Sequence, residues 1–292
     1  MRRNDPRRFP SLSRRALRLS RPQRRLAASF LALLVAAGML LPFLWLVLVS
    51  FSNRSSFGLQ VPSLTVSNYS KVLSPSSGFG FDPFLSSFYL GLGSAILSTV
   101  IGFPAAYALS RGRLRHKRGI MLGALFLSAL PLPALVVPIY ELYTTLGLLN
   151  SLVFTGGVIG VTALPFTVWI LTSQMDSIPV ELDEAAGIDG AGTARVLLRI
   201  ILPVVAPGVS FAFIFSFLQG WGGFLIPLIL DTIPSETPAP IAVYNFMSDH
   251  TGFAFGAIGA FSVLFCIPVV ALYSLVSKQF STGFSAAGAL AG

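Results

Sequence analysis

One stretch decides the fold of this chain: Glu184-Ala185-Ala186-Gly187-Ile188-Asp189-Gly190, which runs on to Ile200-Ile201-Leu202-Pro203. It interrupts the later hydrophobic segments and predicts two short helices joined by a turn at Gly190, because glycine adopts a left-handed backbone at little cost. Residues 176–189 contain five acids and no Lys or Arg. The acids are Asp176, Glu181, Asp183, Glu184 and Asp189. We call residues 177–203 the acidic loop.

The two helices of the acidic loop are expected to be capped by hydroxyl side chains, Ser177 for the first and Thr193 for the second. Gly192, like Gly190, permits a left-handed backbone. An amphipathic helix that rests on an anionic leaflet needs Lys and Arg on its polar face, so lipid headgroups are a poor partner. Spacing alone leaves two interpretations open, a basic protein partner and a solvated connecting loop.

The composition is that of a polytopic membrane protein, with 54% hydrophobic and 11% charged residues among 292. Hydropathy predicts six spans, and each reaches the roughly 20 residues that a helix needs to cross hydrocarbon. They are residues 26–50, 84–109, 119–140, 151–174, 201–230 and 255–277. The fifth is rich in Pro and Gly, so we expect it to be broken, tilted or partly outside the bilayer. The predicted fold class is all-α, with a six-helix transmembrane domain over residues 26–280.

Basic residues predict the orientation in the membrane. With the N-terminus in the cytoplasm, 18 of the 20 Lys and Arg lie inside, and only Arg54 and Lys71 lie outside. That bias is typical of the positive-inside rule. Residues 1–25 hold ten Arg and predict a basic cytoplasmic arm, followed by an uncleaved anchor because no small-residue cleavage site ends the apolar run. The acidic loop and a tail at residues 281–292 are then also cytoplasmic.

Residues for enzymatic chemistry are missing from the sequence. None of the lysines (Lys71, Lys117 and Lys278) follows a glycine, so there is no phosphate-binding P-loop. Two distant histidines and the single Cys266 cannot build a zinc cluster from the usual ligands. We therefore expect no catalytic residue, no metal, no nucleic-acid partner and no cofactor in this chain. A cycle driven by nucleotide would need another subunit to bind ATP and Mg.

Polar and flexible residues inside the fifth predicted span mark a candidate solute path, namely Gln219, Trp221, Gly222 and Gly223. An indole N–H and an amide in hydrocarbon need partners, which a polar solute could supply. The alternative is glycine-mediated helix packing around a buried Trp221. Further lining candidates are Tyr89, Tyr140, Glu141 and Trp169, for which the alternative is an interfacial anchor or a packing residue.

A family resemblance rests on the spacing within the acidic loop. The loop contains Glu184-Ala185-Ala186, then Gly190 after three residues, Ile200 after nine more, and Leu202-Pro203 after one more. This spacing resembles the complete EAA signature of ABC-importer permeases. Flanking motifs resemble the sugar permeases of the maltose-transporter type; they are residues 105–111, 138–140, 146–150, 164–166 and 178–179. The likeness covers roughly residues 26–292.

The resemblance implies a permease subunit in the inner membrane of a bacterium, with alternating access for a sugar or sugar-like solute. The partners it implies are a homologous second permease, two ATPase subunits, an extracytoplasmic solute-binding protein and membrane lipid. The EAA loop would carry a helix that couples to an ATPase. The coupling residues it implies are Glu184, Ala185, Ala186, Asp189, Gly190, Ile200, Leu202 and Pro203.

Two alternatives concern the solute and the energy source. Sugar permeases commonly carry an Asn and an acid after the tryptophan, where this chain has Gly222 and Gly223, which weakens the transfer of sugar contacts. Permeases for amino acids, polyamines or phosphate share the EAA loop. An ion-coupled secondary transporter usually carries acids or Arg at mid-depth, and no acid here lies near the middle of a predicted span.

Overall fold

The computed structural model describes residues 21–52, 65–74, 80–112, 114–249 and 255–290, and the regular elements among them are all helices. The chain divides into two units, residues 1–47 and 48–292, each of which is described by itself. The first unit holds most of α1 (Arg21–Ser50), whose described side chains from residue 28 to residue 44 are exposed. A helix that is apolar all round suits a lipid environment.

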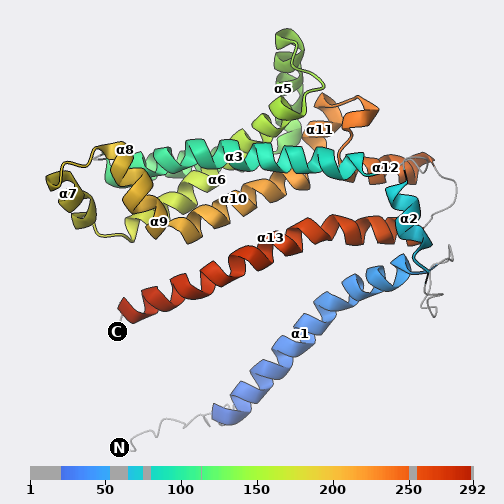
Figure 1. The fold of residues 1–292 in the computed structure, drawn as a ribbon, viewed down its shortest axis with the longest axis horizontal. Coiled ribbons are helices and arrows are strands. Elements are labelled where there is room, and N and C mark those ends of the chain that lie inside the picture. The colour runs from blue at the N-terminus through green and yellow to red at the C-terminus, as the bar shows by residue number, and fades with distance from the viewer. Residues whose placement is uncertain (1–20, 53–64, 75–79, 113, 250–254, 291–292) are drawn as a thin grey trace, which may run out of the picture. The chain divides into compact units, whose positions relative to one another are not determined.

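Three long helices form the centre of the second unit (Figure 1). They are α3 (Asp82–Arg111), α6 (Leu152–Asp176) and α10 (Ala206–Trp221), and each packs on the other two. Gly220 lies directly against the Leu90 carbonyl, so a Cβ there would overlap the backbone of α3. Small residues of this kind let helix backbones approach closely in a membrane.

Hydroxyl side chains link the three helices in their buried centre. Thr167 of α6 bonds both Ser98 of α3, at 2.7 Å, and Ser216 of α10, at 3.1 Å. Ser94 donates to the Ser216 carbonyl at 2.9 Å. Because hydrocarbon offers no competing water, such bonds hold the helices in a fixed register.

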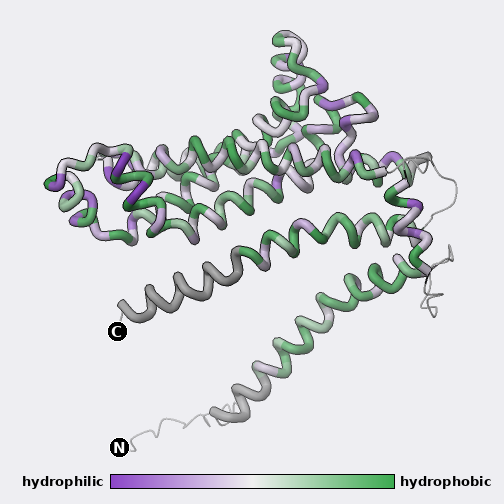
Figure 2. Tube along the Cα trace, viewed as in Figure 1, coloured by the Kyte–Doolittle hydropathy of each residue, from purple (hydrophilic) through white to green (hydrophobic). Residues whose placement is uncertain are grey.

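The predicted all-α polytopic fold is confirmed. In the described part of the chain, four helices are long and apolar enough to span a membrane, and two bent helix pairs raise the number to six. Figure 2 shows hydrophobic residues along these helices and hydrophilic residues gathered at the end where α7 and α8 lie.

The third expected span, residues 119–140, is not one straight helix. It is divided into α4 (Lys117–Ser128) and α5 (Leu132–Leu146), which meet at an angle of 86°. Pro131 has extended backbone between them, with φ −63° and ψ 118°. A proline also disfavours helical backbone in the residue before it, so the helix ends here.

The expected break in the fifth span is confirmed, and there are two breaks. The first is at Val205, where residues 193–204 and α10 meet at 85°. Pro207 has no backbone N–H to donate, which weakens a helix across this point. The second break is at residues 222–224, after which α11 (Leu225–Leu230) begins.

The end of α3 distant from the acidic loop carries shorter elements. They are α2 (Ser67–Leu73), η3 (Pro234–Glu236), α12 (Ala239–Asp249) and the start of α13 (Phe255–Leu290). The buried Asn68 amide donates to the carbonyls of Ser50 and Ser52, at 2.9 and 2.8 Å, and so holds α2 against the end of α1 within this unit. The predicted arm at residues 1–25 lies largely outside the described residues, whereas most of the predicted tail at 281–292 belongs to α13, which continues to Leu290.

Candidate functional site

The acidic loop folds as two helical pieces joined by a turn, as expected. The pieces are α7 (Glu181–Ile188) and a run of α8 (Thr193–Arg195), the π-helix η2 (Val196–Ile201) and α9 (Leu202–Val204). Gly190 has φ +79°, so the predicted left-handed turn is confirmed. The loop lies at one end of the α3, α6 and α10 block (Figure 1).

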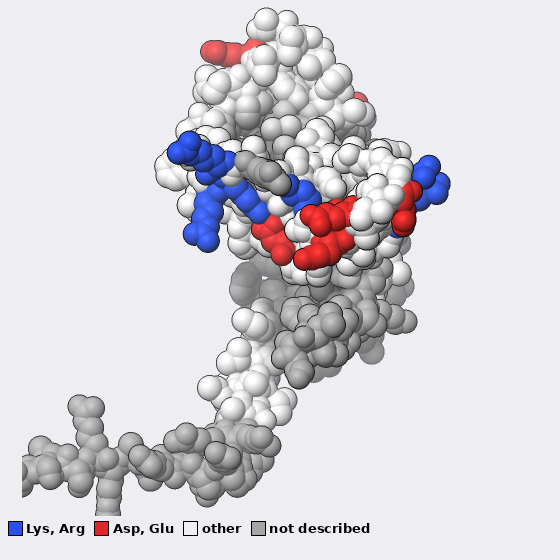
Figure 3. All heavy atoms as spheres, turned by 90° about the vertical axis from the view of Figure 1, so that its left-hand side faces the viewer, with Lys and Arg blue, Asp and Glu red and all other residues white. Residues whose placement is uncertain are grey.

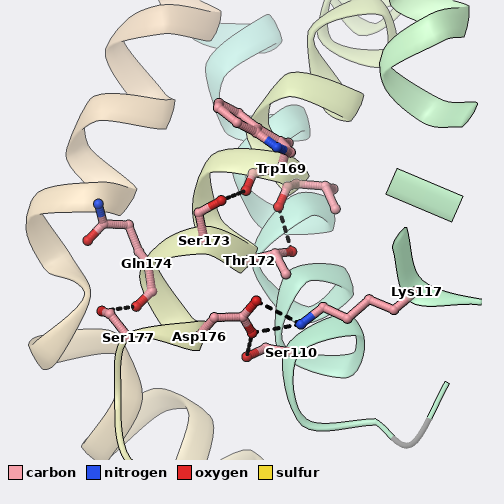
Figure 4. Close-up of polar contacts among 9 residues, drawn as sticks. Ser110, Lys117, Trp169, Thr172, Ser173, Gln174, Asp176 and Ser177 are labelled. Atoms are coloured by element: carbon pink, nitrogen blue, oxygen red, sulfur yellow. Dashed lines mark hydrogen bonds and ion pairs between the residues drawn. The ribbon is translucent and has the colours of Figure 1, made fainter. Parts of the chain in front are cut away.

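The expected caps are wrong in detail. Ser177 is still in helical backbone conformation at the end of α6, and its hydroxyl donates backward to the Gln174 carbonyl at 2.6 Å (Figure 4). Serine competes for nearby carbonyls in this way when the chain has not yet left the helix. Thr193 is the first residue of α8 and caps nothing, whereas Gly192 holds the cap position with φ −69°.

The helix α7 has one face toward the chain's core and one face toward the outside. Asp183 and Ala186 are three residues apart and so share the inner face. Ala186 is 7% exposed and packs in a cluster with Met175 and Ile201. The outer face carries Glu184, Ala185 and Ile188, and Ile188 is 88% exposed. That exposure leaves most of the Ile188 side chain open to a partner.

A basic residue from a distant part of the sequence lies against α7. Arg111, the last residue of α3, places Nε 2.7 Å from Oδ2 of Asp183, and both side chains are nearly buried. The Tyr107 hydroxyl donates to the other carboxylate oxygen, Oδ1, at 3.1 Å. Asp183 is thus held through both oxygens by two residues of α3.

A second such contact joins α6 to the start of α4 (Figure 4). Lys117 donates to both oxygens of Asp176, at 2.8 and 2.7 Å, and Ser110 donates to Oδ1 at 2.6 Å. This pair is more open to solvent than the pair of Arg111 and Asp183. Two of the five acids in residues 176–189 are therefore paired within the chain, with basic residues that come far earlier in the sequence.

Glu181, Glu184 and Asp189 are exposed, as is Asp176 within its ion pair. Figure 3 shows acidic side chains gathered on this face of the molecule, with basic side chains on either side of them. The later signature residues lie just before the first bend. Ile201 is fully buried and Ile200 half-buried, while Leu202 and Pro203 begin the short α9 that leads to Val205.

The candidate path residues do not come together within this chain. Trp221 is 2% exposed and stacks between Phe217 and Phe265, with ring centroids 5.8 and 4.8 Å apart. Its indole N–H donates to the Phe265 carbonyl of α13 at 3.2 Å. Gln219, two residues earlier on α10, is exposed. Gly222 and Gly223 form the second break, and exposed side chains are found at Tyr89, Tyr140, Glu141 and Trp169.

Polar residues at the opposite end of α6 surround a buried acid. Asp231 follows α11, outside the membrane-spanning segments, and accepts a bond of 2.9 Å from the Thr155 hydroxyl. Its Oδ2 and the Oε2 of Glu236 are buried without a hydrogen-bond partner among the described residues. Burial raises the pKa of Asp231 to about 6; the bond from Thr155 opposes that shift, and the Glu236 charge adds to it.

We expect Asp231→Asn to stabilise the protein more at pH 7 than at pH 4. The folded chain keeps the Asp231 proton to about pH 6, whereas the unfolded chain releases it near 3.8. The stability from this group is complete below pH 3.8, falls by about 3 kcal/mol between pH 3.8 and 6, and is constant above that range. Asn removes the charge and keeps the acceptor for Thr155. Thermal unfolding of both proteins between pH 4 and 8 checks this, and a stability difference independent of pH would contradict it.

The described residues contain no group of three or more His, Cys, Asp or Glu that could hold a metal ion. The candidate site instead consists of α7, which packing and an ion pair hold at the end of the block of α3, α6 and α10. The sequence profile described as "Binding-protein-dependent transport system inner membrane component" matches residues 98–282. The chain belongs to this family of ABC-transporter permeases.

Individual permeases match over nearly the whole chain. The trehalose/maltose transport system permease protein MalG of Thermococcus litoralis is 32% identical, over 89% of this chain and 95% of that protein. The sulfoquinovosyl glycerol transport system permease protein SmoH of Agrobacterium fabrum is 30% identical, over 92% and 93% respectively. A solved structure of a bacterial ABC transporter involved in alginate import has the same fold, with a TM-score of 0.71 at 22% identity, and covers 90% of this chain and 99% of its own.

As a permease subunit of an ABC importer, the chain is a multi-pass inner-membrane protein and not itself an enzyme. Membership also implies an ATPase partner and a place in a larger complex. The sequence did not reveal three features of the permease: the partner of Asp183, the partner of Asp176 and the exposure of Ile188. A local charge pattern cannot reveal a contact between residues some 60 to 80 positions apart, as these are.

Proposed function

We propose that this permease forms the translocation path for a sugar or sugar-like solute and couples it to ATP hydrolysis by alternating access. Its partners in this proposal are a homologous second permease, two ATPase subunits and an extracytoplasmic solute-binding protein, with both chain ends and the acidic loop in the cytoplasm. The trehalose/maltose and sulfoquinovosyl glycerol permeases support the solute class.

The observation that carries the proposal is the division of α7 into a held face and an open face. Ala186 packs into the core, while Glu184, Ala185 and Ile188 are open to a partner. An exposed apolar residue beside acids fits a groove on an ATPase that is apolar at its centre and basic at its rim. Asp189 lies at the end of the same helix, next to the Gly190 turn.

The second half of the acidic loop suits the transfer of motion. Ile200, Leu202 and Pro203 lie between the Gly190 turn and the 85° bend before α10. Closure of the ATPase pair would push on α7, and the short run of η2 and α9 would turn α10 and the helices packed on it. Coupling of this kind is reciprocal, so a loaded binding protein favours the closed ATPases as much as they favour its docking.

Solute contacts belong to the region of the second break in this proposal. Gln219 is exposed beside Gly222, and an exposed amide at this depth suits bonds to hydroxyls. Trp221 acts from within the wall, because its ring is enclosed by Phe217 and Phe265. The surface that Gln219 faces would be completed by the second permease.

Purification of the tagged permease from native membranes tests the proposal. We expect a second permease and an ATPase to accompany it, and we expect reconstituted vesicles to take up trehalose or maltose only with Mg-ATP. An amino acid and inorganic phosphate serve as alternative solutes. Uptake of one of those alone would overturn the solute class, and uptake driven by an ion gradient without ATP would overturn the function.

Replacing Ile188 with alanine is expected to weaken the hold of the ATPase by about tenfold, because most of a buried apolar side chain is lost. The fold should be unaffected, since Ile188 makes little contact with its own chain. The measurement is the amount of ATPase retained during dilution of the purified complex. Ser177→Ala is the matched control, since its hydroxyl bonds only within the end of α6. Equal retention by the two variants would contradict the docking role.

A further inference from the structure

The helix α7 has two covalent attachments, one at each end. Residues 177–180 join it to α6, and residues 189–192, with the left-handed Gly190, join it to α8. Two points of attachment define an axis about which a short rigid body can still rock. A push on the exposed face of α7 would partly rotate α7 about this axis, and would move the membrane helices less, unless a third point holds the helix.

Beyond the packing of Ala186, Asp183 in the first turn of α7 supplies a polar attachment to α3. Its carboxylate meets Arg111 through Oδ2 and Tyr107 through Oδ1, so that both oxygens are engaged. Tyr107 and Arg111 are four residues apart and lie on one face of α3. The carboxylate therefore fixes the rotation of α7 as well as its distance from α3.

The environment of this ion pair makes it a costly way to gain stability. The two side chains are only 12% and 13% exposed, so both charges are largely removed from water. Nε and Nη2 of Arg111 and Oδ2 of Asp183 are all buried with no hydrogen-bond partner among the described residues, so Nε and Oδ2 meet as an ion pair and not as a hydrogen bond. A buried ion pair of this kind contributes little to net stability compared with apolar residues of the same size. Its distinctive effect is geometric, because salt and solvent barely weaken it.

We propose that Arg111, Asp183 and Tyr107 form an orientation clamp that makes α7 and α3 move as one body. This inference rests on the proposed function, because it assigns these residues the transfer of ATPase motion to the membrane helices. They are positioning residues, and none of them is placed at the outer face of α7. Since α3 packs along α6 and α10, a rotation of α7 held by the clamp becomes a movement of the whole block.

The structure provides a matched control. Asp176 and Lys117 make an ion pair of similar length at the same end of the molecule, but it joins α6 to α4 and does not touch α7. If loss of any ion pair here loosened the loop, Asp176→Asn would have the effect of Asp183→Asn. The clamp predicts an effect for Asp183 alone.

Spin labels on α7 and α3 report the orientation directly. The sites are Leu182→Cys and Val100→Cys, which are both exposed, in a Cys266→Ser background in the complete purified complex. We expect a narrow distance distribution in the unaltered clamp, with the same centre before and after trapping with Mg-ATP and vanadate. Asp183→Asn should broaden the distribution and Asp176→Asn should not. A distribution in Asp183→Asn as narrow as in the parent overturns the clamp.

Transport gives the second measurement. In Asp183→Asn we expect maltose or trehalose uptake per ATP hydrolysed to fall about tenfold, within the usual range of coupling between sites, while hydrolysis itself continues. The double exchange Arg111→Asp with Asp183→Arg should recover most of the coupling, and Arg111→Lys should retain part of it, since only Nε meets the carboxylate. A merely structural role would instead lower the yield of complex and leave the ratio unchanged in what survives.

The proposed function and the clamp fail in different ways. A parent complex without an ATPase, or one that hydrolyses ATP without taking up either sugar, overturns the proposed function or its solute class. The label distances before nucleotide is added need neither ATP hydrolysis nor solute, so they still decide whether Asp183 orients α7. An unchanged uptake ratio in Asp183→Asn, in a parent complex that does transport, overturns the coupling role.

Discussion

Replacing Gly190 with valine is expected to abolish ATP-driven uptake while the permease still inserts into the membrane. Gly190 has φ +79°, and a Cβ built on it meets no atom within 4 Å. The cost is therefore in the backbone itself, where a left-handed residue loses about 1–2 kcal/mol and a β-branched side chain loses more. The turn would relax toward negative φ, and α7 would no longer be aligned with η2. Uptake in reconstituted vesicles measures the loss.

Two further variants separate backbone strain from added bulk at this turn. A Cβ built on Gly192 would also meet no atom within 4 Å, but the φ of −69° at this position suits any residue. Gly192→Val should therefore transport nearly as well as the parent. Asparagine tolerates left-handed backbone, so Gly190→Asn should keep most of the uptake that Gly190→Val loses. Wild-type uptake by Gly190→Val, or equal loss in Gly192→Val, would show that the turn does not work through its backbone conformation.

The acidic loop shows how far sequence reasoning extends. Its helices and turn follow from local properties, because a glycine at Gly190 and apolar residues at helical spacing act within a few positions. Its anchoring to the bundle could not be predicted, because Arg111 pairs with an acid more than 70 residues later. The sequence shows that Asp183 is acidic, but the direction in which it points depends on how α3 and α6 pack.

In the broken spans, too, some features follow from the local sequence and others do not. The second break coincides with Gly222 and Gly223, and its existence was expected from the glycines themselves. Pro131 carries a strong local signal for the bend between α4 and α5, but hydropathy does not register it, since proline in an apolar run leaves the mean almost unchanged. Hydropathy therefore predicts how many residues enter the membrane better than the path they take through it.

Polar residues at membrane depth were the hardest to interpret. The indole N–H of Trp221 needs an acceptor, and both a solute and a neighbouring helix could supply one. The structure places the Phe265 carbonyl there, from a helix that begins more than 30 residues later. Nothing local to residues 219–223 identifies that neighbour. The exposed Gln219 is consequently the better candidate for direct contact with solute, and Trp221 the better candidate for support.

Replacing Trp221 with alanine is accordingly expected to lower the stability of the permease severely, by roughly 3–5 kcal/mol, as for other large-to-small changes in a core. The change removes a 2% exposed ring that stacks on Phe217 and Phe265 and leaves a cavity between α10 and α13. Thermal unfolding and the yield of assembled complex measure the effect.

Two neighbouring substitutions give this prediction its contrast. Trp221→Phe keeps most of the stacking and loses only the N–H bond to Phe265, so it should cost much less than alanine. Gln219→Ala, on the exposed side of the same helix, should leave unfolding unchanged and act on the affinity for sugar alone. The opposite pattern, a stable Trp221→Ala complex with altered solute preference, would mean that the ring leaves its pocket during the transport cycle and meets the solute directly.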